Sequence, residues 1–145
     1  MYENKEQEII DMILEMIKLG YPDEKIVKDF EVKLLKLHNL KLSQFFSVNI
    51  KGADVKAHGQ VIIDSENLEE NYEFATNVKG ADVKAHGKII INSGSIEYNE
   101  KFKLIEGSDI DAHVTAINNT KIQKCKESLN ECLDSMIKEK VKVKK

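Results

Sequence analysis

Asn49–Ile63 reads NIKGADVKAHGQVII, and Asn77–Ile91 repeats it as NVKGADVKAHGKIII with three mild changes. A third, more divergent copy over Gly107–Val114 keeps the Asp and the His at the same mutual spacing. Repeats with a period of 20 to 50 residues are typical of arrays of one supersecondary unit. The sequence therefore predicts three similar units, spaced by 28 and then by 27 or 28 residues.

The Lys-Gly pair of each unit decides the predicted local fold. If Lys51-Gly52 is a two-residue hairpin turn in which Gly supplies a positive φ, Val48 faces Val55 and Phe46 faces Ala57. Apolar residues then face apolar residues, as a packed sheet requires. We therefore predict three hairpins forming an antiparallel β-meander of about six strands over residues 43–118. Two alternatives stay open, namely Gly as a bulge in one long strand and a β-solenoid with one coil per unit.

The segments on either side of the repeats show a helical period. Residues 1–42 predict a helical hairpin or a tri-helical unit, and residues 119–145 predict a long amphipathic helix with a lysine-rich tail. The predicted fold class is therefore α+β, with the flanking helices covering the apolar face of the sheet in a single domain.

Three Asp/Lys/His sets lie on the predicted sheet face opposite the phenylalanines. Asp and His bind metals and carry protons, and lysine binds anions, so this face is the candidate ligand- or partner-binding site. Neighbouring equivalent strands lie about 10 Å apart, so one metal ion would not bridge two sets, and we predict no metal and no cofactor. The candidate residues are Asp54, Lys56, His58, Asp82, Lys84, His86, Asp109, Asp111 and His113.

The C-terminal helix carries an apolar seam. Ile122, Cys125, Leu129, Cys132 and Met136 are separated by 3, 4, 3 and 4 residues, which is the heptad spacing of a coiled coil. The seam either covers the sheet or pairs with another subunit, and it predicts a homo-oligomer. Seven residues of helical rise separate the two cysteines by roughly 10 Å, too far for an intrachain disulfide.

Composition limits the classes of function. All 22 basic residues are lysine, arginine is absent, and the formal net charge is −3, so nucleic-acid binding is not favoured. The sequence has no apolar run long enough to span a membrane, and its polar, acidic start is unlike a signal peptide, so we expect a cytoplasmic protein. Catalytic signatures such as a phosphate-binding Gly-rich loop or H-E-x-x-H are missing, which predicts a protein that is not an enzyme.

These observations give a leading hypothesis, a non-enzymatic oligomeric binding protein for a protein partner or a small anionic ligand. A compact duplicated chain of this kind also suits an inhibitor or sequestering protein of a mobile element.

The rival hypothesis rests on residues 21–42, where a short helix, a turn and a second helix resemble a helix-turn-helix. That resemblance implies a DNA-binding transcriptional regulator that dimerises through residues 120–140, with Lys33, Lys36 and Lys41 on one exposed face. A third hypothesis is a holdase chaperone with an exposed, phenylalanine-lined sheet.

Overall fold

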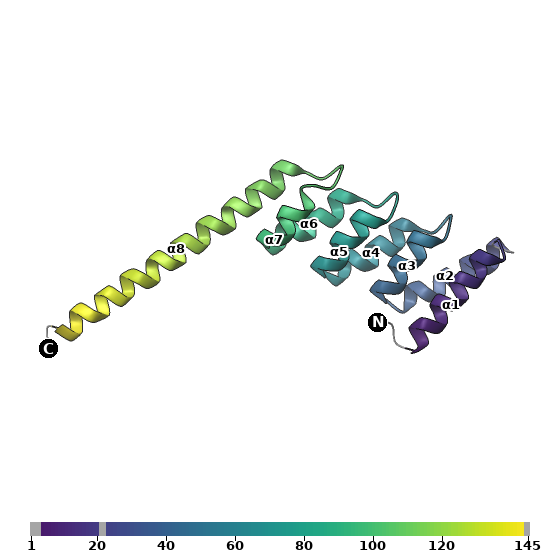
Figure 1. Cartoon of the computed structure of the whole chain (residues 1–145), viewed down its shortest axis with the longest axis horizontal. Helices are drawn as coiled ribbons and strands as arrows, with labels where there is room; N and C mark the ends of the chain where they lie inside the picture. Colours follow the sequence, from purple (N-terminus) through teal and green to yellow (C-terminus); the bar gives the residue numbers. More distant parts are fainter. Residues whose placement is uncertain (1–3, 21–22, 144–145) are drawn as a thin grey trace.

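The computed structural model describes residues 4–20 and 23–143 of the chain, and this part is entirely helical. From α3 onward its helices pack as successive antiparallel pairs, which stack side by side with α1 and α2 into an elongated solenoid (Figure 1). The eight helices described are α1 (Asn4–Lys18), α2 (Glu24–Lys36), α3 (Leu40–Asn49), α4 (Val55–Ser65), α5 (Leu68–Asn77), α6 (Val83–Ser93), α7 (Ile96–Phe102) and α8 (Ile110–Val143).

The solenoid has two layers. The first layer consists of α1, α3, α5 and α7, and the second consists of α2, α4, α6 and the beginning of α8. Each helix packs against its neighbours in the same layer, and α3, α5 and α7 also pack against α4, α6 and α8 of the other layer, whereas α1 contacts α3 and α2 contacts α3 and α4. Such an array is held together by contacts within each pair and between adjacent pairs. The 28-residue repeat found in the sequence is thus one α-helical hairpin.

The predicted α+β fold with a β-meander over residues 43–118 is wrong, because the described residues of that range form helices and no strands. Gly52 and Gly80 do have positive φ angles of 83° and 85°, but the turn that they make joins two helices rather than two strands. Asp54 and Asp82 follow each turn as helix N-caps. A Lys-Gly turn therefore fits both a β-hairpin and a helical hairpin, and the residues after it decide.

The apolar core follows helical spacing along every repeat. In α4, Val55, His58 and Ile62 lie on one face, three and then four residues apart, and His58 and Ile62 are fully buried. If the histidine is taken as a solvent-facing polar residue, apolar and polar residues alternate along this segment as they would in a strand.

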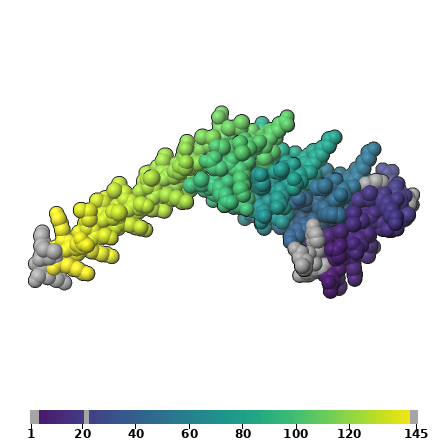
Figure 2. Space-filling model, in the orientation of Figure 1, coloured from purple at the N-terminus to yellow at the C-terminus, as the bar shows by residue number. Residues whose placement is uncertain are grey.

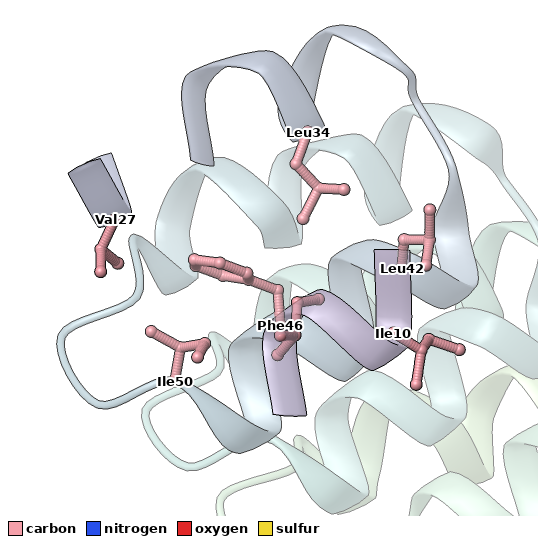
Figure 3. Close-up of a cluster of buried hydrophobic side chains, with 7 residues drawn as sticks. Ile10, Val27, Leu34, Leu42, Phe46 and Ile50 are labelled. Carbon is pink, nitrogen blue, oxygen red and sulfur yellow. The ribbon is translucent and has the colours of Figure 1, made fainter. Parts of the chain in front are cut away.

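Each repeat also contributes one fully buried phenylalanine, which packs at the centre of its helical hairpin. Phe46 belongs to the N-terminal core, where side chains from α1, α2 and α3 converge around its ring (Figure 3). Phe74 and Phe102 hold the equivalent places in the next two pairs. The holdase hypothesis needed an exposed phenylalanine-lined sheet, and the structure contains neither the sheet nor the exposed rings among its described residues.

The body of the solenoid ends near Thr120, whose Oγ donates to the carbonyl of Gly94 at 2.9 Å. Helix α8 continues well past this contact as a single helix that leaves the body (Figures 1 and 2). All described side chains from Lys121 to Lys142 are exposed. We call residues 121–143 the arm. At 1.5 Å per residue, the 22 residues 121–142 extend the helix by roughly 33 Å.

Candidate functional site

The three repeat histidines are buried inside the solenoid instead of lining one polar face. His86 of α6 packs against Phe74, with ring centroids 4.9 Å apart, and His113 of α8 packs against Phe102, with ring centroids 5.0 Å apart. Exposed surface amounts to 1% for both histidines and 0% for His58. The sequence-based expectation of a solvated Asp/Lys/His face therefore fails for its three histidines.

An asparagine of the preceding first-layer helix fixes each of the last two histidines. The ring Nδ1 of His86 lies 2.7 Å from Asn71 Oδ1, and the ring Nδ1 of His113 lies 2.7 Å from Asn99 Oδ1. The amide nitrogen of Asn71 donates to the carbonyls of Ile62 and Asn67 at 3.1 and 2.8 Å. Because the amide nitrogen is committed as a donor, Asn71 Oδ1 accepts, and His86 must carry its proton on Nδ1.

The glycine after each internal histidine makes room for the histidine of the next repeat. A Cβ added to Gly59 would come within 3.3 Å of His86 Nε2, and one added to Gly87 would come within 2.9 Å of Phe102 Cε1 and 3.1 Å of His113 Nε2. The third copy has Val114 at this position, where no further repeat follows and the side chain is exposed. The glycines therefore serve close packing between repeats.

His58, the first of the three histidines, has a different environment. This environment explains why Glu31 and Ser43 replace the glycine and the asparagine of the later repeats. Glu31 of α2 stands where the later repeats have glycine, and its Oε2 lies 3.1 Å from His58 Nε2. The same oxygen accepts from the backbone N–H of Asp54 at 2.7 Å, and Lys28 Nζ lies 3.2 Å from Glu31 Oε1. Ser43 replaces the asparagine, and neither its Oγ nor His58 Nδ1 has a hydrogen-bond partner. In a neutral His58 the proton therefore sits on Nε2, the opposite tautomer to His86.

Burial sets the ionisation of all three histidines. It lowers the pKa of His86 to about 4, although the negative charge of Asp82 opposes this shift. Burial also lowers the pKa of His113, and it lowers the pKa of His58 although the hydrogen bond that His58 donates to Glu31 opposes this shift. The rings are therefore neutral at pH 7 and act as packed hydrogen-bonding groups, not as proton carriers exposed to a substrate.

Three of the four aspartates of the predicted site are structural caps. Asp54, Asp82 and Asp109 accept hydrogen bonds from the backbone N–H of the residue three positions later, at 3.0, 3.1 and 3.2 Å. This satisfies donors that the first turn of a helix leaves free. Lys56, Lys84 and Asp111 are exposed at the starts of α4, α6 and α8, one repeat apart. A binding role for these residues remains a prediction, and the described residues contain no group of side chains suited to hold a metal ion.

A groove that the sequence did not indicate lies between the first-layer helices α3 and α5. Its volume is about 550 Å³, and Phe45 and Val48 supply its apolar part. Glu70 and Glu73 contribute carboxylates from α5. Burial raises the pKa of Glu70, the negative charges of Glu73 and Glu69 raise it further, and the positive charge of Lys41 opposes this rise. The remaining lining residues are Lys41, Gln44, Asn49 and Asn77.

The arm is the second surface with unusual chemistry. Five of its apolar side chains are at least 53% exposed, and the two cysteines of the chain are exposed on it as free thiols. Positions 121–145 hold eight lysines and four acidic residues, which gives a net charge of +4. Residues 1–120 carry 14 lysines and 21 acidic residues, which gives a net charge of −7. An acidic body thus carries a basic, partly apolar helix. The five exposed apolar side chains are Ile122, Leu129, Met136, Ile137 and Val141, and Leu133 is 47% exposed.

The predicted helix-turn-helix spans residues 21–42, of which residues 21 and 22 lie outside the described part of the chain, and residues 23–42 adopt a different arrangement. Helix α2 pairs with the first layer, and α3 begins the next repeat of the solenoid, so both are parts of the stacked array. Lys33, Lys36 and Lys41 are exposed, but Lys41 also lines the groove beside Glu70 and Glu73.

Comparison with protein-family models, curated proteins and solved structures finds no match for this chain. Across the described residues, no helix combines the length and apolar character that crossing a membrane would require.

Proposed function

We propose that this chain is a non-enzymatic scaffold that binds a protein partner on its first-layer surface and joins further copies of itself through the arm. The groove between α3 and α5 carries this proposal, because it combines exposed apolar surface with two carboxylates, one of which, Glu70, has a pKa raised by burial. Helical solenoids commonly present such extended surfaces to binding partners. The buried histidines and capping aspartates support the scaffold and leave its outer surface for binding.

The chemistry of the groove selects a basic partner segment. Val48 is 49% exposed and offers an apolar contact, while Glu70 and Glu73 stand on the opposite wall. A partially buried carboxylate beside two other acidic residues gains most from a cation brought next to it. A short amphipathic segment with one apolar side chain and a Lys or Arg satisfies both features. The net charge of −7 on residues 1–120 would also speed the encounter with such a segment.

The proposal is tested with Val48→Asp, using Gln60→Glu on the second layer as the control. Both changes add one negative charge at an exposed or half-exposed position, but only the first lies in the groove. A partner retained from the cells of origin by the wild type and by the control, and lost from Val48→Asp, supports the groove. Equal retention by both variants, or no retained protein, overturns it.

A direct measurement uses defined peptides. A helical peptide with leucine and lysine on one face should bind the full chain, and its affinity should fall at least tenfold on Glu73→Lys, because a carboxylate that attracts the peptide becomes a repelling ammonium. The matched peptide with glutamate in place of lysine should not bind. A preference for the acidic peptide would contradict the assignment.

A further inference from the structure

The arm presents its apolar seam on the side of α8 that faces away from the solenoid. His113 points into the body, and Ile122 follows nine residues later, which is two and a half helical turns. Leu129 and Met136 repeat Ile122 at seven-residue intervals and so share its side of the helix. A second molecule can therefore lie along this seam without meeting the body of the first.

The arm cannot owe its helical state to contacts within the described chain. Beyond Thr120 no described side chain of α8 is buried, and isolated helices of this size are marginal in water. Serines and asparagines such as Ser128 and Asn130 further weaken its intrinsic helix propensity. Packing of the seam against another helix would supply the missing stabilisation.

The pattern of the seam fits a second copy of the same arm. In heptad notation, Ile122, Leu129 and Met136 take position a, and Cys125 and Cys132 take position d. A parallel, in-register pair places each of these residues beside its own copy and forms five continuous layers before Glu139 ends the seam. Layers of Ile, Leu or Met at position a alternate with layers of the smaller cysteine at position d.

The antiparallel alternative is less favourable. Pairing Leu129 with Cys132 of a reversed arm would bring Ile122 against Glu139 and Lys121 against Lys142. In the parallel pair, flanking g and e positions bring only Lys121 near Lys126, while Ser128 and Ser135 fill the other g positions. The parallel pair therefore buries no carboxylate among its five layers and places fewer like charges together.

Deepening the self-association included in the proposed function, we propose that the arm forms a parallel, in-register, two-stranded coiled coil with a second copy of this chain. The two bodies then lie at the same end of the coiled coil, on its opposite outer sides. Each dimer presents two α3/α5 grooves, so a partner with two basic segments would gain affinity by binding both.

Single-cysteine variants of the full chain distinguish the two orientations. With Cys132→Ser, only Cys125 remains, and with Cys125→Ser, only Cys132 remains. Mild oxidation should give a covalent dimer in both variants, because each thiol lies beside its own copy in a parallel pair. In the antiparallel pair described above, Cys125 would face Met136, and neither variant would cross-link efficiently.

A matched control places the thiol on the outer side of the same helix. Lys124→Cys in the background of Cys125→Ser and Cys132→Ser should show at least tenfold slower cross-linking, since position 124 lies on the face opposite the seam. Cross-linking as fast as that of Cys125 would show random collision and would overturn the pairing.

The mass in solution provides the second readout and does not depend on oxidation. Under reducing conditions, light scattering should give twice the chain mass of 16.5 kDa. Leu129→Glu should give a monomer with lower helical content, whereas Asn130→Glu, one residue outside the seam, should remain a dimer. A monomeric or trimeric wild type overturns the two-stranded pair. A monomer whose peptide binding still depends on Glu73 would overturn the pairing and leave the groove intact.

Discussion

Asn71→Ser tests whether the asparagine–histidine pair holds adjacent helices together. Asn71 accepts from His86 Nδ1 at 2.7 Å and donates to two backbone carbonyls, and its side chain is fully buried. Serine is too short to replace these bonds, as Ser43 shows at the equivalent place, where its Oγ has no partner. The change leaves the buried N–H of His86 without an acceptor.

The expected cost follows from this orphaned donor. A buried polar group without its partner costs about 1–3 kcal/mol, and the lost contacts of the amide add to it, so we expect a loss of about 2–3 kcal/mol in the free energy of unfolding. That corresponds to roughly a 30- to 150-fold change in the folding equilibrium. The Ile62 carbonyl is less affected, because it also accepts from Ser65 Oγ at 2.6 Å.

Urea unfolding followed by circular dichroism measures this effect, with Asn92→Ser as the control. Asn92 is exposed on α6, so the same chemical change there should alter the free energy of unfolding by less than about 0.5 kcal/mol. Equal destabilisation by the two variants would refute the role assigned to Asn71. Nitrogen NMR of the imidazoles adds a direct check, since His86 should be protonated on Nδ1 and His58 on Nε2. The reverse assignment would contradict the hydrogen-bond scheme.

Three further predictions concern the same core. Burial lowers the histidine pKa values below the 6.5 of the unfolded chain, so the free energy of unfolding should be constant above about pH 6.5 and fall toward pH 4. For His86 alone the loss is on the order of 3 kcal/mol, and His86→Phe should flatten the pH dependence of urea unfolding. Gly87→Ala should destabilise by about 1–2 kcal/mol because its Cβ would meet Phe102 at 2.9 Å, whereas Val114→Ala should be nearly neutral in the same assay. Asp82→Ala should lower the melting temperature through a loss of about 1 kcal/mol from the N-cap of α6, and an unchanged value would contradict that role.

The sequence was sufficient to predict the repeat, its three units and the long helix that follows them, but not the type of secondary structure within the repeat. The pairing role of the heptad seam stays a prediction. Gly52 with a positive φ suits both kinds of hairpin, so the turn alone did not discriminate. His86 and His113 are polar side chains but behave as core residues because Asn71 and Asn99 accept from their ring nitrogens. The two residues of each pair lie on different helices, 15 positions apart for Asn71 and His86 and 14 for Asn99 and His113, so no local sequence pattern predicts the pairing.

Some local signals did favour helices. Asn67 and Ser95 precede Glu69 and Glu97, so a capping residue is followed by a carboxylate in the first turn, as is typical of a helix start. Gly59 argued against a helix, because glycine lowers helix propensity by about 1 kcal/mol relative to alanine. The close approach of the next repeat explains why glycine is nevertheless present there. The groove between α3 and α5 could not be predicted at all while its two walls were assigned to strands.

The departures from the repeat mark where the array begins and ends. At the N-terminal side, Glu31 and Ser43 occur together for a chemical reason. The carboxylate of Glu31 accepts a hydrogen bond from His58 Nε2–H, and an asparagine acceptor at position 43 would then require a second proton on the buried ring. At the C-terminal side, Val114 replaces the glycine because no further histidine approaches. The body is thus closed at both ends by substitutions in its own helices, which leaves α8 free to extend beyond Thr120 and present its seam to another molecule.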